Sequence, residues 1–285
     1  MSPETRSRLY VLAAALLFST GGAAIKATSF TGWQVAGFRS GFAALTIAML
    51  LPPARASWTP RFALIGLIYT VMTVSFSLAN KLTTAANAIF LQDSAPLYLI
   101  LLGPLLLKEA VRRSDVVFLI VMAGGASLFF LGEQSASATA PNPSLGNMVA
   151  VISSVSWAMV IGILRWMERQ GAGGEPGMAV VMSGNATSFL LCLGLALPVS
   201  GASWTDWATI VYLGCIQIAM GYVLLTRGVR GISALEASLL MVAEPTFSPI
   251  WAWLLHGERP SGLALAGGVL IIGSTIARVA WQARK

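Results

Sequence analysis

Long apolar stretches, separated by short polar breaks, run along the whole chain. A helix needs about 20 apolar residues to cross the ~30 Å hydrocarbon core of a bilayer. Stretches of this length recur throughout, and breakers such as Pro52-Pro53 and Ala140-Pro141-Asn142-Pro143 stand between them. The pattern predicts ten transmembrane helices, near residues 8–26, 32–51, 61–80, 84–106, 114–132, 145–167, 178–199, 205–227, 233–255 and 261–281.

Two regions decide the helix count. Residues 9–50 and 233–281 are nearly continuous apolar runs, which only their polar residues divide. The first run also resembles a secretory signal, because Arg6 and Arg8 precede it. It is long for the apolar region of a signal peptide, and further apolar segments follow. We therefore interpret it as the first, uncleaved span.

The composition indicates that lipid is the main solvent of this chain. Hydrophobic residues make up 56% of it and charged residues 10%, whereas a soluble domain has about 25% charged residues. The net charge of +7 does not indicate a nucleic acid partner, because most basic residues stand in short connections between apolar runs. No phosphate-binding G-x-x-x-x-G-K-[ST] motif is present, which excludes ATP hydrolysis of that type.

The basic residues also predict the orientation. With a cytoplasmic N-terminus, 14 Lys and Arg residues fall on the inner side, and Lys26, Lys81 and Arg259 fall on the outer side. Inner loops of bacterial membrane proteins carry such an excess of positive charge. We therefore expect a multi-pass protein of the bacterial inner membrane with both termini in the cytoplasm.

The chain also contains an internal repeat. Ala88, Leu91, Pro96, Glu109 and Gly124 recur 149 residues later as Ala237, Leu240, Pro245, Glu258 and Gly273. The Ser-Trp-Thr at 57–59 recurs at 203–205, and Phe18 corresponds to Trp157. This pattern divides the chain into halves 1–133 and 145–285, joined by a periplasmic linker at 134–144. Five spans per half give inverted topology, an arrangement that secondary transporters use.

Two stretches carry a resemblance to a known family. They are Asp93-Ser94-Ala95-Pro96 with Lys108-Glu109, and Ala243-Glu244-Pro245 with Gly257-Glu258-Arg259-Pro260. In them the chain resembles the drug/metabolite transporter superfamily, specifically its EamA-type ten-helix exporters, and looks most similar to aromatic amino acid exporters. The resemblance covers both halves. It implies a central cavity lined by the first, third, fourth, sixth, eighth and ninth helices, and export of small metabolites.

Two carboxylates inside predicted spans are the leading functional candidates. An ionisable group at the bilayer centre costs about 2.5–3.5 kcal/mol or more, so such groups are functional hypotheses by default. Asp93 and Glu244 each precede a proline, Pro96 or Pro245, on equivalent helices. We expect them to face the cavity and handle substrate or protons; structural pairing, for instance with Arg39, is the alternative.

The two prolines are expected to bend their helices. A proline inside a helix removes a backbone donor and displaces the carbonyl one turn earlier. The carbonyls freed in this way, near Gln92 and Met241, would be acceptors for a substrate ammonium group.

Two basic residues also lie within or beside spans. Arg39 is flanked by Gly37 and Gly41, a spacing that lets helices approach closely. It can bind a substrate carboxylate, but its place early in its helix favours structural pairing or reaching the outer interface. Lys26 is expected to anchor the outer end of the first helix.

Uncharged polar and aromatic residues complete the expected site. Interhelical hydrogen bonds and helix packing explain most such residues, so the choice follows their place on helices beside the proposed cavity. The predicted substrate-binding residues are Asn87, Gln92, Asp93, Tyr98, Trp157, Gln217, Tyr222 and Glu244, with Pro96 and Pro245 as helix-bending residues.

Metal and cofactor chemistry is not expected. His256 is the only histidine, and Cys192 and Cys215 both stand in apolar stretches. This set provides neither a metal site nor a disulfide framework, and hydrolytic enzymes that act in membranes would need further histidines or a second aspartate within a span.

The sequence therefore predicts a secondary transporter rather than an enzyme. It would act as a monomer, without a cofactor or a nucleic acid partner, and export amino acids, aromatic and other neutral ones, from cytoplasm to periplasm by alternating access. The alternatives are export of other metabolites or drugs, such as polyamines or sugars, and a passive channel or accessory membrane protein.

Overall fold

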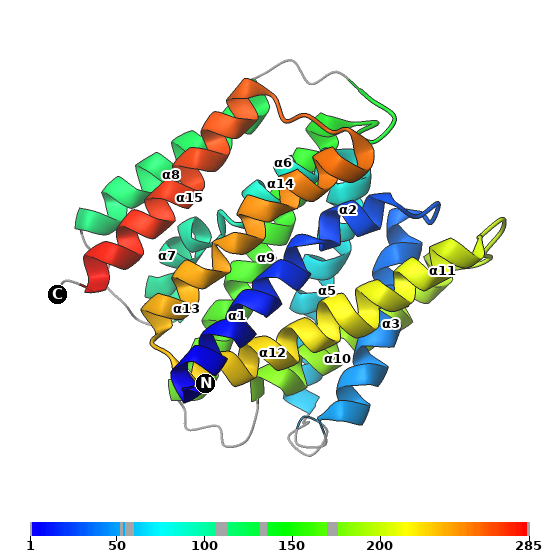
Figure 1. Ribbon diagram of the computed structural model, residues 1–285, viewed down its shortest axis with the longest axis horizontal. Coiled ribbons are helices and arrows are strands. Elements are labelled where there is room, and N and C mark those ends of the chain that lie inside the picture. Colours follow the sequence, from blue (N-terminus) through cyan, green and yellow to red (C-terminus); the bar gives the residue numbers. More distant parts are fainter. Residues whose placement is uncertain are drawn as a thin grey trace.

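Helices dominate the computed structural model, which describes residues 2–51, 54, 60–106, 113–131, 136–169 and 176–283 (Figure 1). The described residues contain an isolated β-bridge between Ser137 and Ala140 but no strand, so the prediction of an all-helical fold is confirmed. The helices are α1 (Pro3–Ser19), α2 (Gly21–Lys26), α3 (Gly32–Leu50), α5 (Pro60–Leu82), α6 (Ala85–Gln92), α7 (Ala95–Leu106), α8 (Arg113–Leu131), α9 (Pro143–Arg169), α10 (Pro176–Ala196), α11 (Trp204–Val211), the π-helix η1 (Tyr212–Met220), α12 (Gly221–Gly228), the 3₁₀ helix η2 (Val229–Gly231), α13 (Ala234–Met241), α14 (Ala243–His256) and α15 (Gly262–Ala283).

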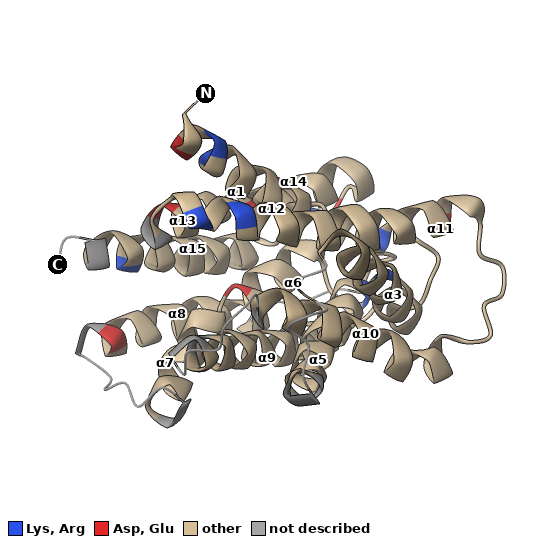
Figure 2. Ribbon diagram, turned by 90° about the horizontal axis from the view of Figure 1, so that it is seen from below, with Lys and Arg blue, Asp and Glu red and all other residues tan. Residues whose placement is uncertain are grey.

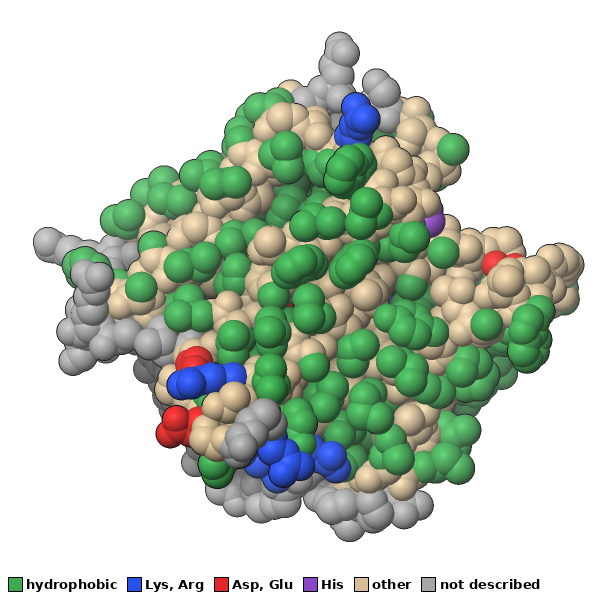
Figure 3. All heavy atoms as spheres, in the orientation of Figure 1, with side chains coloured by type: hydrophobic (Ala, Val, Ile, Leu, Met, Phe, Trp, Pro, Cys, Tyr) green, Lys and Arg blue, Asp and Glu red, His purple; other side chains and the backbone are tan. Residues whose placement is uncertain are grey.

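The exterior suits a lipid environment. Among the described residues, seven helical stretches are long and apolar enough to cross a membrane, and a shorter apolar helix covers Asp115–Leu131. Apolar side chains spread over the face shown in Figure 3, while most of its charged side chains gather at the edge near the N-terminus. Charged residues are sparse along the helices in the perpendicular view (Figure 2). The fold is therefore that of a membrane protein, and the total of ten spans stays a prediction.

Helices of the two halves pack against one another in reciprocal pairs. α5 packs on α9, and α12 packs on α1; α6 and α7 pack on α9, and α13 and α14 pack on α1. α3 pairs with α10, and α8 pairs with α15 at the side of the bundle (Figure 1). In these pairs, a contact of a helix in the first part of the chain is matched by a contact of the corresponding helix in the second part. Both termini lie at the same end of the bundle.

Two helices are interrupted at equivalent places. α6 begins after Thr84 and α13 begins after Ser233, and each hydroxyl accepts a hydrogen bond of 3.2 Å from a backbone N–H of its own first turn. Ser, Thr, Asn and Asp favour this position because they satisfy a backbone donor that has no intrahelical partner. α6 ends at Gln92 and α13 at Met241, again 149 residues apart.

The predicted bends at Pro96 and Pro245 are interruptions that lie slightly earlier in the chain. Pro96 is the second residue of α7, and Pro245 is the third residue of α14. In the first turn of a helix a proline has no hydrogen bond to lose and its φ angle is already suitable. The prolines therefore lie in the first turns of the new helices, and the breaks themselves lie at residues 93–94 and 242.

A buried ion pair closes one end of the bundle. Lys26, the last residue of α2, pairs with Glu258 at 2.9 Å, and their side chains are only 2% and 4% exposed. Lys26 also donates to the carbonyl of Thr83 at 2.8 Å and to that of Thr139, and Glu258 accepts from the first backbone N–H of α6, that of Ala85, at 2.9 Å. Lys26 was expected to anchor the end of the first helix; the structure adds that it does so by joining the ends of α2, α6 and α14.

Glu258→Gln should lower the thermal stability of the purified protein in detergent, because it leaves Lys26 buried without a counter-charge. Breaking a buried ion pair costs about 3–5 kcal/mol, which corresponds to a Tm loss on the order of 10 °C for a chain of this size. Glu236→Gln is the control, since its ion pair with Arg8 is much more exposed, and it should change the Tm little. Equal losses in the two variants would contradict this assignment.

Candidate functional site

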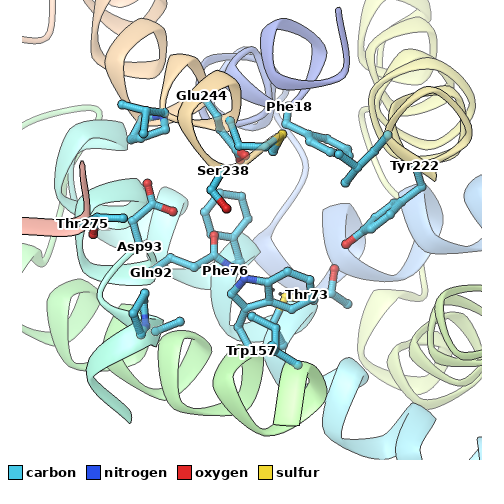
Figure 4. A pocket seen from close by; sticks show the side chains of 18 of the residues that line it. Phe18, Thr73, Phe76, Gln92, Asp93, Trp157, Tyr222, Ser238, Glu244 and Thr275 are labelled. Carbon is cyan, nitrogen blue, oxygen red and sulfur yellow. Dashed lines mark hydrogen bonds between the residues drawn. The ribbon is translucent and has the colours of Figure 1, made fainter. Parts of the chain in front are cut away.

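A cavity of about 500 Å³ lies at the centre of the bundle, where the interrupted helices meet (Figure 4). Its walls come from α1, α3, α5, α6, α7, α9, η1, α12, η2, α13, α14 and α15, so both halves of the chain contribute. The polar and aromatic residues of the wall include Phe18, Arg39, Tyr69, Thr73, Phe76, Gln92, Asp93, Trp157, Gln217, Tyr222, Ser238, Glu244 and Thr275.

One wall is acidic. Asp93 stands at the end of α6, in the break before α7, and Glu244 is the second residue of α14. Oδ2 of Asp93 is buried and has no hydrogen-bond partner among the described residues. No ion pair joins either carboxylate to a described Lys or Arg. The breaks thus bring two carboxylates without a counter-charge among the described residues to one side of the cavity, and this makes that side acidic.

A guanidinium group forms a second pole of the cavity. Arg39 in α3 is 3% exposed, and its Nη2 donates to Thr73 Oγ1 at 2.8 Å and to the Thr73 carbonyl at 3.2 Å. Its Cζ lies 5.9 Å from the centre of the Phe76 ring. The sequence favoured structural pairing or the outer interface for Arg39; the structure places it in the cavity wall, held by Thr73 rather than by a carboxylate.

Aromatic rings line the space between these poles. Phe18 and Tyr222 meet edge to face, with ring centres 5.2 Å apart, and Trp157 projects from α9 beside Gln92 (Figure 4). The hydroxyl of Tyr69 accepts from the Asn185 side chain at 3.1 Å. Such rings present large, rigid apolar surfaces with polar edges, which suits a solute with an apolar or aromatic body.

The π-helix η1 supports two parts of the site. Such widened turns are rare and often occur at functional sites. Gln217 in η1 donates to the carbonyl of Phe18 at 3.4 Å, beside the break between α1 and α2, and its Oε1 is buried without a partner among the described residues. Gly214 lies so close to α3 that an added Cβ would be 2.5 Å from the carbonyl oxygen of Arg39. η1 therefore packs tightly on the backbone of Arg39 and contributes Gln217 to the cavity lining.

Six of the eight predicted substrate-binding residues line this cavity, as do Pro96 and Pro245; the six are Gln92, Asp93, Trp157, Gln217, Tyr222 and Glu244. Asn87 lies away from it, because its amide donates to Thr83 Oγ1 at 3.3 Å and to Asn147 Oδ1 at 3.2 Å. Tyr98 packs against the core between α6, α8 and α15 instead.

One predicted acceptor is already in use. The carbonyl of Gln92 was expected to be free for a substrate ammonium group, but Ser154 Oγ donates to it at 3.0 Å. The Gln92 side chain in turn donates to Ser153 at 3.1 Å. Serines of α9 therefore provide hydrogen-bond partners for the carbonyl and the side chain at the end of α6. The carboxylates, rather than this carbonyl, are the acceptors that remain for a substrate ammonium group.

Other wall residues were not among the predicted ones. Thr73, Ser238 and Thr275 are uncharged and stand in apolar helices, so nothing in the sequence distinguishes them from residues that bond within the helix. Phe18 did carry a signal, since the repeat pairs it with Trp157. Within the described part of the chain, no group of three or more His, Cys, Asp or Glu side chains is arranged to hold a metal ion.

Comparisons with known proteins agree with a transporter. The sequence model of the EamA-like transporter family matches the chain twice, over residues 5–131 and 144–278. Pseudopaline exporter CntI of two Pseudomonas aeruginosa strains is 26% identical over 277 residues, which cover 94% of each chain. The uncharacterized transporter YdfC of Bacillus subtilis is 26% identical over 81% of this chain and 74% of its own. One crystal structure superposes with a TM-score of 0.64 at 19% identity over 98% of both chains, which supports the fold alone.

Gly184→Ala should destabilise the cavity wall. Gly184 in α10 packs on the ring of Tyr69, and an added Cβ would lie 2.4 Å from Tyr69 Cδ1. The ring must move, and overpacking of this kind costs about 1–3 kcal/mol, so we expect a lower Tm in detergent. Gly194→Ala in the same helix is the control, because nothing lies within 4 Å of its added Cβ. If Gly184→Ala melted at the same temperature as Gly194→Ala, the close contact would be wrong.

Proposed function

Because the chain belongs to the EamA-like transporter family, we propose that this membrane transporter exports amino acids, aromatic ones included, from the cytoplasm to the periplasm. In this proposal it resides in the bacterial inner membrane as a monomer, with both termini in the cytoplasm. The six cavity residues identified above, among them Asp93, Glu244 and Trp157, contact the substrate.

The observation that carries the proposal is the mixed lining of the cavity. Two carboxylates occupy one wall, a guanidinium occupies another, and aromatic rings lie between them. An ammonium group suits the carboxylates, a carboxylate suits Arg39, and an aromatic or aliphatic side chain suits the rings. A sugar phosphate would need more basic groups than this cavity offers, and a polyamine would leave Arg39 facing a cation.

Alternating access between two inverted halves is the proposed mechanism. The reciprocal packing of the halves supports it, since a two-fold axis in the membrane plane generates contacts in matched pairs. The double match of the family model supports it as well. Ten spans, divided into halves 1–133 and 145–285 with a periplasmic linker at 134–144, are part of this proposal.

The described conformation supports an inward-facing assignment. The cavity lining includes residues of η2 and α13, and α13 lies toward the end of the bundle that holds the N-terminus (Figure 1). The buried pair of Lys26 and Glu258 closes the opposite end. In the proposed cycle this pair separates when the substrate leaves toward the periplasm, and the inner end closes.

A second cargo has its own support. The relative CntI is named a pseudopaline exporter, and the alignment with it covers 94% of both chains. Identity of 26% is low enough for the cargo to differ, so we keep pseudopaline as the alternative substrate beside amino acids.

Purified protein in proteoliposomes should catalyse saturable, counter-flow-stimulated uptake of amino acids, with aromatic ones among the best. The test is a panel of labelled phenylalanine, tryptophan, leucine, glucose and spermidine, with pseudopaline added as unlabelled competitor. Saturation and counter-flow separate a carrier from a channel. Saturable uptake of glucose or spermidine without amino acid uptake would refute the proposed cargo. If unlabelled pseudopaline inhibits the measured uptake and the unlabelled members of the panel do not, the alternative cargo is favoured.

Neutralising Asp93 and Glu244 together (Asp93→Asn, Glu244→Gln) should abolish uptake driven by an acidic vesicle lumen. The physical reason is that amides of the same shape can neither exchange protons nor attract an ammonium group. Glu236→Gln is the matched control, because its ion pair with Arg8 lies outside the cavity lining. Undiminished pH-driven uptake by the double variant would exclude the role of these two carboxylates.

A further inference from the structure

We infer that Arg39 is the anion-binding residue of the cavity, and that through it the transporter selects solutes that carry a carboxylate in addition to a cationic group. The inference rests on the proposed function, since it specifies the chemistry of the cargo. It assigns to Arg39 the carboxylate-binding role that its place early in its helix had disfavoured relative to structural pairing.

The first argument is that Arg39 lacks a counter-charge. Its side chain is buried with 3% exposure, yet none of the ion pairs among the described residues includes it. Lys26, which is also deeply buried, shows the usual solution, a carboxylate at 2.9 Å. A buried charge without such a partner is strongly unfavourable. A substrate carboxylate would supply the missing charge in the loaded state.

The second argument is that the guanidinium is held in place but only partly used. Thr73 accepts two hydrogen bonds from Nη2, and the Phe76 ring lies 5.9 Å from Cζ. The Nε donor remains buried without a partner among the described residues. A planar guanidinium in a fixed orientation with free donors is suited to bind a carboxylate. Thr73 and Phe76 therefore act as positioning residues for Arg39.

The third argument is the separation of the poles. Asp93 lies on one side of the cavity and Thr73, which holds Arg39, on the other, with Gln92 and Trp157 between them (Figure 4). Like Nε of Arg39, Oδ2 of Asp93 is buried without a partner. Residues of opposite charge thus line one cavity from two sides, so the binding site as a whole is zwitterionic and matches a zwitterionic solute.

The first test does not depend on transport. Arg39→Met replaces the charge by an apolar chain of similar length, and its Tm in detergent should equal or exceed that of the wild type, because an uncompensated buried charge is removed.

Benzoate should raise the Tm of the wild type more than the uncharged benzyl alcohol does, and Arg39→Met should remove this difference. A lower Tm for Arg39→Met, together with equal effects of both compounds on the wild type, would overturn the inference.

The second test uses flux and a matched pair of solutes, phenylalanine and 2-phenylethylamine, which differ only by the carboxylate. The wild type should favour phenylalanine at least tenfold in kcat/KM. Arg39→Gln should raise the KM for phenylalanine at least tenfold and leave that for phenylethylamine unchanged, with Arg39→Lys intermediate. Arg259→Gln is the control, since Arg259 is exposed and absent from the cavity lining.

The outcomes separate the inference from the proposed function. Equal losses for both solutes in Arg39→Gln would show a structural role and overturn the inference. If the wild type transports neither solute, the amino acid proposal fails, and the benzoate measurement still decides whether Arg39 binds anions. A benzoate effect that survives in Arg39→Met would refute the inference in that case as well.

Discussion

The structure depends on one constraint, that each polar backbone group released by a break in a helix inside the membrane needs a new partner. Unsatisfied N–H and C=O groups cost several kcal/mol each in hydrocarbon. Side chains of the breaks and of neighbouring helices meet this need: Ser94 donates to the Leu91 carbonyl at 2.6 Å, and Thr20 donates to that of Leu17 at 2.7 Å. Ser154 and Gln217 do the same from other helices. The breaks can therefore exist at the centre of the bundle, and that is where the cavity lies.

The buried charged residues fall into two groups, those that are paired with an opposite charge and those that are not. At the closed end, Lys26 and Glu258 satisfy each other and join three helix ends. At the cavity, Asp93, Glu244 and Arg39 have no counter-charge among the described residues. A paired charge contributes to a stable state, whereas an unpaired buried charge is a cost that a bound solute can offset. This difference between the two ends is the basis for proposing that the cavity binds a charged solute and that the ion pair closes the other end.

Much of the fold could be predicted from the sequence because it depends on local properties. Apolar length predicts where helices lie, and the described helices fall within or close to the expected ranges. The repeat at an offset of 149 residues also agrees with the equivalent short helices α6 and α13, which begin after Thr84 and Ser233 and end at Gln92 and Met241. An ionisable group within an apolar span is costly wherever it points, so Asp93 and Glu244 could be identified without coordinates.

By itself, the sequence determined the membrane class, the family and the two acidic residues, since these follow from hydropathy and motifs along one chain. Only the tertiary structure decided which side chains share a space. It turned Arg39 inward to Thr73, paired Lys26 with Glu258, and withdrew Asn87 and Tyr98 from the cavity. The physical reason is that each of these outcomes depends on a partner from a helix distant in the chain. A polar side chain of a helix can find a partner on more than one neighbouring helix, and only the tertiary packing decides which one it meets.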